Sequence, residues 1–208
     1  MPLRLETIKM VPAKQMDVVK FSESINSKIG WEDIIKNFDY YVAYKVMSGK
    51  FPLSLMAVST RPDLVSFPEI DLNKMKHEYV YLDRLEKYPQ AEEIPGIGVI
   101  SIAQLVKLSQ SWGLRGRLIL DACLESVPFY EKIGMILVGP RRFIFTPQTA
   151  NNYLKWAISY LRGKGYTDNP TNPDEQILLY GEFDVGPSKE YLNNPTFLEG
   201  DFTVGPRK

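Results

Sequence analysis

The chain has 208 residues, of which 44% are hydrophobic and 24% are charged, the proportions of an ordinary globular protein. Its 25 Lys and Arg balance its 25 Asp and Glu, so overall charge gives no reason to expect nucleic acid or an anionic membrane surface as a partner. One cysteine excludes an internal disulfide, and the sequence has neither an apolar signal core nor a run of the roughly 18 apolar residues that a membrane span needs. We therefore expect a soluble, cytoplasmic protein that binds neither nucleic acid nor a membrane.

The first part of the chain contains segments with a regular hydrophobic pattern, separated by turn residues. Apolar residues alternate with polar ones in strands and recur every three to four residues in helices. On this basis we expect a strand at 3–10, a helix at 14–29, a helical turn at 31–37, and strands at 40–47 and 53–60. The turn at 48–50 makes the last two strands an antiparallel hairpin. Residues 64–76 have no clear pattern.

The second part begins with a strand that Pro89 ends and continues with alternating helices and strands. We expect a strand at 78–87, a helix at 99–112, a strand at 118–120, a helix at 126–134, two short strands within 136–146, and a helix at 148–161. Beyond Gly163 the composition shifts to Pro, Gly, Asn and Asp.

The turn Gly96-Ile97-Gly98 stands between a predicted strand and a predicted helix. Glycines let the backbone approach a ligand closely, and the N–H groups at a helix start favour an anion. The turn is not a dinucleotide fingerprint, because Ser101 stands where the third glycine would be, and no Walker lysine follows it. We expect an anion to bind here through backbone donors.

With the strand at 81–85, Pro89, the Gly96-Ile97-Gly98 turn and the segment Phe129–Met135, the sequence resembles the GNAT superfamily of acyl-CoA-dependent N-acyltransferases. The resemblance covers about residues 3–147. It implies an α/β (α+β) fold in which helices flank a mixed, mostly antiparallel sheet. We expect that domain at residues 1–147, followed by a C-terminal helix and an extended tail at 148–208.

The resemblance also implies where acetyl-CoA binds. Its pyrophosphate loop corresponds to residues 94–99, and its pantetheine arm pairs with the strand before the loop. The cofactor-binding residues expected from it are Leu85, Glu86 and Lys87 on the strand and Ile94, Gly96, Ile97, Gly98 and Val99 in the loop. Tyr130 corresponds to the family's tyrosine beside the CoA sulfur, where a phenol can protonate the departing thiolate.

A base must remove a proton from the attacking ammonium. Among Glu86, Asp83 and Glu69 we choose Glu86, since it flanks the strand that pairs with the cofactor; the alternative is a solvated or salt-bridged carboxylate. A metal site is not expected, because His77 is the only histidine. Cys123 is expected to be a buried packing thiol rather than a nucleophile.

The function implied is transfer of an acetyl group from acetyl-CoA to a primary amine of a small molecule or peptide. The alternative is a GNAT-like module for ligand sensing or protein contact that has lost catalysis, because Glu93 stands where the family usually has Arg or Gln. The tail repeats a Gly-x-Phe-x-Val-Gly-Pro pattern at 181–187 and 200–206. It is either a pair of similar turns or an arm that docks on the core or on a second subunit of a homodimer.

Overall fold

The computed structural model describes residues 8–24, 30–59 and 79–167. Some expectations lie outside these ranges: the start of the first strand, the end of the first helix, the segment 64–76, Glu69, His77 and the repeated tail. Within the described ranges, no helix is both long enough and apolar enough to cross a membrane.

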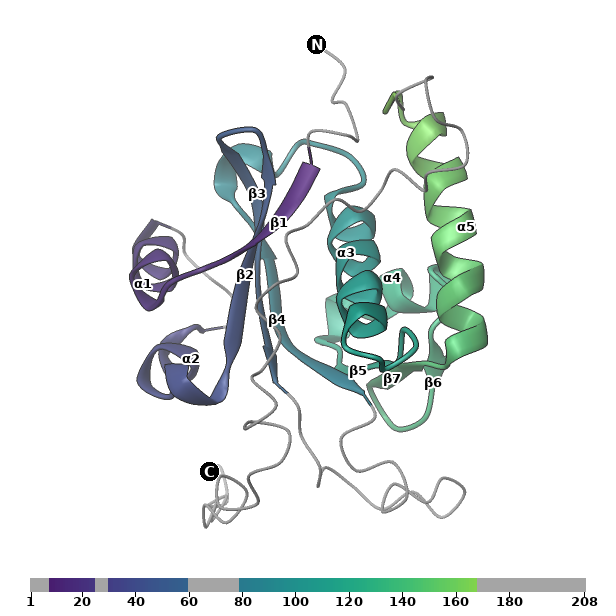
Figure 1. Ribbon diagram of the computed structural model, residues 1–208, viewed down its shortest axis with the longest axis horizontal. Coiled ribbons are helices and arrows are strands. Elements are labelled where there is room, and N and C mark those ends of the chain that lie inside the picture. Colours follow the sequence, from purple (N-terminus) through teal and green to yellow (C-terminus); the bar gives the residue numbers. More distant parts are fainter. Residues whose placement is uncertain (1–7, 25–29, 60–78, 168–208) are drawn as a thin grey trace.

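In the described ranges, seven strands form one mixed sheet in the order β1-β2-β3-β4-β5-β7-β6 (Figure 1). They are β1 (Ile8–Pro12), β2 (Val42–Ser48), β3 (Phe51–Ser59), β4 (Val80–Lys87), β5 (Leu118–Asp121), β6 (Ile136–Leu137) and β7 (Arg142–Phe145). All neighbours pair antiparallel except β4 and β5, which are parallel. The expected mixed, mostly antiparallel sheet is confirmed.

Helices cover both faces of this sheet. They are α1 (Gln15–Ser24), α2 (Glu32–Lys36), α3 (Ile97–Ser111), α4 (Val127–Lys132) and α5 (Pro147–Gly163), with short 3-10 turns η2 (Phe38–Tyr40), η4 (Pro89–Ala91) and η5 (Leu124–Ser126). In Figure 1, α1 and α2 lie together on one side of the strands, and α3, α4 and α5 lie on the other. A separate core of buried side chains therefore lies under each helical layer.

Strand β3 shows why both faces are covered. From Leu53 to Ser59 every residue is buried, the pattern of a central strand rather than of one with a wet face. Leu53 and Met56 belong to the core beneath α3, whereas Leu55 and Ala57 pack with Phe21 of α1 and the side chains around α2. The expected β2–β3 hairpin is confirmed, and Gly49 adopts the left-handed φ of +59° in its turn.

The predicted helix at 148–161 is confirmed as α5, which the chain starts with a capping box. The Thr146 side chain accepts from the Thr149 N–H, the Thr149 hydroxyl accepts from the Thr146 N–H, and Pro147 occupies the first turn. The face with Tyr153, Ala157 and Leu161 is buried in the same core as α3. Helix α5 is thus part of the body that carries the site.

Element boundaries shift by a few residues from those expected. Helix α3 begins at Ile97 instead of Val99, because Gly96 takes a left-handed φ of +84° and serves as its N-cap. The helix expected at 126–134 is shorter, since α4 follows a 3-10 turn and Gly134, at φ +81°, comes just after its end.

Candidate functional site

Strands β4 and β5 separate part of the way along the sheet. Their parallel pairing covers only Val80–Leu82 of β4, whereas pairing with β3 on the other side continues to Lys87. In the described part of the chain, no strand pairs with the β5-facing edge of β4 beyond Leu82. The sheet therefore has a gap beside residues 83–87, just before the glycine turn.

The hydrogen-bond pattern of β4 tells which backbone groups face this gap. The Tyr88 N–H donates to the Leu53 carbonyl on β3 at 3.0 Å, and in an antiparallel pair successive residues direct their backbone groups to opposite edges. The main-chain groups of Leu85 and Lys87 consequently face the gap. Those of Glu86 point toward β3, so the expected backbone contact from Glu86 is wrong.

The glycine turn presents unpaired donors at the start of α3. The first N–H of this region with a backbone acceptor in the helix is that of Ile100, which donates to the Gly96 carbonyl at 2.9 Å. Among the described residues, none accepts a hydrogen bond from the N–H groups of Ile97, Gly98 or Val99, as expected for a first helical turn. The Ile94 N–H, by contrast, already donates to the Ala91 carbonyl at 3.1 Å. Of the loop residues expected to bind the cofactor, Ile94 therefore has no unpaired N–H to offer.

The acidic residues before the turn do not enter it. Glu92 and Glu93 are both exposed, and the Lys87 Nζ donates to the Glu92 carbonyl oxygen at 3.1 Å. This bond fixes one cation on the segment between β4 and the turn. Lys107 is too far along α3 to help, since ten residues of helix span about 15 Å.

Helix α5 and the residues after it hold the turn in place. A Cβ at Gly96 would lie 2.7 Å from Leu161 Cδ2, so only glycine fits beneath α5. The Tyr166 hydroxyl donates to the Pro95 carbonyl and the Tyr153 hydroxyl to the Val99 carbonyl, both at 2.6 Å. The residue types alone gave no sign of these contacts, because the partners are 71 and 54 residues apart.

Tyr130 lies on the α3 side of the sheet. Its ring packs against Phe129 and Phe143 at centroid distances of 5.1 and 5.7 Å, and its residue is 8% exposed. Burial raises the pKa of Tyr130 well above its usual value, and the nearby Cys123 adds to the rise. Within the described ranges, no residue accepts a hydrogen bond from its hydroxyl, so the protonated phenol is a donor available to a ligand.

Glu86 lies on the opposite face. Its residue pairs with Leu55, which belongs to the α1/α2 core, and the Nε1 of the fully buried Trp31 donates to Glu86 Oε2 at 2.9 Å. Asp83, the other described candidate base, accepts from the Ser59 hydroxyl at 2.8 Å. The two residues predicted to be catalytic therefore flank the sheet from its two sides.

Two other sequence features have structural explanations. Ser101, which replaces a fingerprint glycine, is buried, bonds to the Ile97 carbonyl and shares a 2.7 Å hydrogen bond with Ser54, joining α3 to β3. Cys123 is exposed and 3.1 Å from the Ser126 hydroxyl, so the expectation of a buried thiol is wrong. The error arises because β5 ends at Asp121 and the chain turns outward before α4.

Comparison with known proteins gives structural matches alone. No protein-family model matches the sequence, and no curated protein matches it. The crystal structure of AtaTR bound with AcCoA is 14% identical, with a TM-score of 0.52, over 71% of this chain and 98% of that chain. The structure of AAC(6')-Ib with paromomycin and acetyl-CoA is 13% identical, with a TM-score of 0.52, over 69% of this chain and 95% of that chain.

A second AAC(6')-Ib structure, an aminoglycoside acetyltransferase in complex with coenzyme A and kanamycin, is also 13% identical, with a TM-score of 0.52, over 70% of this chain and 98% of that chain. These neighbours are GNAT acetyltransferases, and the chain has the GNAT-superfamily fold. At such low identity the likeness establishes the fold, and the reaction follows only from the site.

Proposed function

We propose that this protein transfers an acetyl group from acetyl-CoA to a primary amine by direct attack of the amine nitrogen. The observation that carries the proposal is the loss of β4–β5 pairing after Leu82, directly before a turn with three unpaired helix-start N–H groups. An extended amide-bearing arm that ends in a diphosphate fits this combination. Acetyl-CoA has both parts and, when bound, supplies the thioester.

Binding would use the backbone of the chain. The main-chain groups of Leu85 and Lys87 face the gap and would pair with the amides of the pantetheine arm. The N–H groups of Ile97, Gly98 and Val99 would hold the diphosphate at the positive end of α3. The Lys87 N–H, which faces the same gap, would polarise the thioester carbonyl, an effect that matters most in a site that excludes water.

Proton transfers would occur on the two faces of the sheet. The amine enters from the α1/α2 face, where Glu86 accepts its proton, and its nitrogen bonds to the acetyl carbon as the carbon–sulfur bond breaks. On the other face Tyr130 stabilises the departing sulfur by donating its hydroxyl proton or a hydrogen bond. Because burial raises the pKa of Tyr130, the phenol is neutral throughout the physiological range.

The alternative of a module without catalysis depends on Glu93. Its carboxylate is exposed, where solvent and salt screen its charge, and the neighbouring Glu92 carbonyl holds the ammonium group of Lys87. These observations favour the enzyme. The acceptor class, a small-molecule or peptide amine, together with a cytoplasmic location and a homodimer formed through the tail, stay predictions.

Thermal unfolding with and without acetyl-CoA tests the proposal. A ligand at 100 times its Kd stabilises the folded state by about 2.7 kcal/mol, which raises the Tm of a chain of this size by about 5–10 °C. Free pantetheine, which lacks the phosphates, serves as the control and should raise Tm less. Release of free CoA thiol on adding primary amines then measures transfer. No Tm shift at millimolar acetyl-CoA would contradict the proposal.

A further inference from the structure

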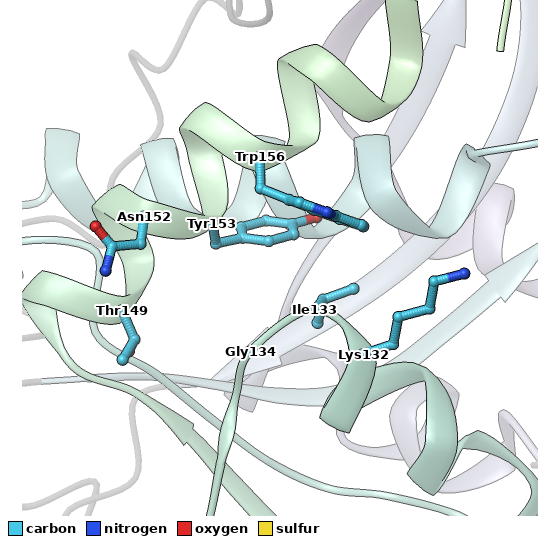
Figure 2. A pocket seen from close by; sticks show the side chains of 7 residues that line it. All are labelled: Lys132, Ile133, Gly134, Thr149, Asn152, Tyr153 and Trp156. Atoms are coloured by element: carbon cyan, nitrogen blue, oxygen red, sulfur yellow. The ribbon is translucent and has the colours of Figure 1, made fainter. Parts of the chain in front are cut away.

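A groove runs between the end of α4 and the first half of α5 (Figure 2). It has a volume of about 270 Å³ and is lined by Lys132, Ile133, Gly134, Thr149, Asn152, Tyr153 and Trp156. Figure 2 shows the Trp156 and Tyr153 rings above the turn after α4, with the Lys132 side chain extending from the end of that helix. One wall is therefore aromatic and one end is cationic.

Aromatic rings connect this groove with the glycine turn. The Trp156 and Tyr160 rings stack at a centroid distance of 4.9 Å and an interplanar angle of 24°. The Tyr160 Cε1 atom is in turn only 3.8 Å from where a Cβ on Gly96 would lie. Tyr160 thus connects the turn at the start of α3 with Trp156 in the wall of the groove.

Two lysines lie beside this path. Lys132 Nζ is 5.7 Å from the Tyr160 ring centroid, and Lys164 Nζ is 5.6 Å from it. Neither ammonium group forms an ion pair with a carboxylate among the described residues. They supply, from α4 and from the end of α5, the positive charge that the sequence between Gln90 and Val106 lacks.

We infer that this groove holds the nucleotide half of acetyl-CoA, with the adenine against the Trp156 indole and the 3′-phosphate between Lys132 and Lys164. The inference rests on the proposed function, since it starts from a diphosphate at the glycine turn. Every base has a π face that stacks on an aromatic ring, and ammonium groups bind phosphate as point charges. Helix α5 then has two roles: it packs on α3, and it forms one wall of the nucleotide site.

Calorimetric titration of the full chain with acetyl-CoA and with 3′-dephospho-acetyl-CoA tests the two lysines. The unchanged protein should bind acetyl-CoA about tenfold more tightly, the effect of one charge-assisted contact. The double variant Lys132→Gln/Lys164→Gln should bind both ligands with similar Kd values. Lys155→Gln is the matched control, because Lys155 is exposed on the same helix and does not line the groove.

The outcomes separate this inference from the proposed function. Equal affinity of the unchanged protein for both ligands, or full discrimination in the double variant, would overturn the nucleotide site while leaving acetyl-CoA binding intact. Absence of binding to either ligand would overturn both. Both variants alter only exposed side chains, so each should unfold at nearly the temperature of the unchanged protein.

Tryptophan fluorescence tests the aromatic wall independently. The adenine should quench Trp156 when acetyl-CoA is added, whereas acetyl-pantetheine, which lacks the nucleotide, should not. In Trp156→Phe the same addition should leave the emission of Trp31 and Trp112 unchanged. Quenching that persists in Trp156→Phe, or that acetyl-pantetheine reproduces, would place the nucleotide elsewhere.

Discussion

The Tyr166 hydroxyl donates a 2.6 Å hydrogen bond to the carbonyl oxygen of Pro95 and so ties the chain after α5 to the turn before α3. The two residues are 71 positions apart in the sequence. Their contact joins α5 to α3 at the end of the helical layer where the unpaired N–H groups of the first turn of α3 lie. It makes the position of the candidate anion site depend on the C-terminal helix.

Replacing Tyr166 by Phe should lower the free energy of unfolding by about 1 kcal/mol, the net contribution of one such hydrogen bond. For a chain of this size the Tm should then fall by about 2–4 °C. Tyr40→Phe is the control, since Tyr40 is 52% exposed and its substitution removes no buried hydrogen bond. Equal Tm values for the two variants would show that the bond to Pro95 contributes nothing.

The same tyrosine predicts a loss of stability at alkaline pH. Burial, with a smaller effect from Tyr160, raises the pKa of Tyr166 to about 12, against about 10 in an unfolded chain. The folded state then holds the proton more tightly, so the stabilisation is complete below pH 10 and is lost as pH rises toward 12. Denaturant unfolding should show a shallower alkaline decline in Tyr166→Phe than in the unchanged protein; parallel declines would contradict this assignment.

Gly96→Ala should destabilise the protein more than Gly113→Ala does. Both glycines have left-handed φ values, +84° and +78°, so both substitutions incur a backbone cost of about 1–2 kcal/mol. Only at Gly96 would the new methyl group meet Leu161, at 2.7 Å, whereas nothing lies within 4 Å at Gly113. Overpacking should add about 1–3 kcal/mol, measured as a difference between the two denaturant midpoints.

A second variant isolates the clash. Leu161→Ala frees the space above position 96, so Gly96→Ala should cost less in that background than in the unchanged protein. Additive effects of the two substitutions would mean that Leu161 does not constrain position 96.

Tyr130→Phe should lower kcat by about 10²-fold, the lower range for a lost proton donor, and leave the Kd of acetyl-CoA nearly unchanged. The phenylalanine ring keeps the packing against Phe129 and Phe143, so the Tm should stay close to that of the unchanged protein. Steady-state kinetics with a saturating amine give kcat, and calorimetry gives Kd. An unaltered kcat would remove Tyr130 from the mechanism.

Trp31→Phe tests the positioning of Glu86. The substitution keeps a buried ring but removes the N–H that donates to Glu86 Oε2 at 2.9 Å. We expect a fall in kcat of about tenfold, smaller than that of Glu86→Gln, and no change in the Kd of acetyl-CoA. If the Kd changes and kcat does not, Trp31 supports the fold of β4 rather than the orientation of the base.

Hydrogen exchange can locate the cofactor on β4. The amides of Leu85 and Lys87 face the gap, so they should exchange fast although they lie inside a strand, while the Glu86 and Tyr88 amides, which face β3, should exchange slowly. Acetyl-CoA should slow exchange at Leu85 and Lys87 selectively. Uniform protection of all four amides would indicate general stiffening instead of pairing.

Local patterns predict the frame of the site well. The glycine turn, the strand before it and the helix after it are each encoded in adjacent residues, and the structure places them within two residues of the expected bounds. The contacts that complete the site are not local. Trp31 and Glu86 are 55 residues apart, and nothing in either neighbourhood pairs an indole N–H with that carboxylate.

Helix α5 shows the same limit from another side. The apolar face of α5 predicts that the helix packs on the body of the protein, but the periodicity does not identify the element on which it packs. Tyr160 and Leu161 reach the turn at Gly96 because β7, which precedes α5, returns the chain to a position beside β5. The sequence has no Lys or Arg between Gln90 and Val106, but Lys132 and Lys164 lie beside the ring of Tyr160, which borders the turn.

The gap beside β4 has a further consequence for the kind of molecule that can enter it. Paired strands lie about 4.8 Å apart, so a chain inserted between β4 and β5 needs these strands separated by roughly 10 Å, two such spacings. Only a slender, extended molecule with amide groups at strand-like intervals can fill that width and satisfy Leu85 and Lys87 together. We therefore expect the interrupted sheet to accept an extended molecule in preference to a branched or folded one.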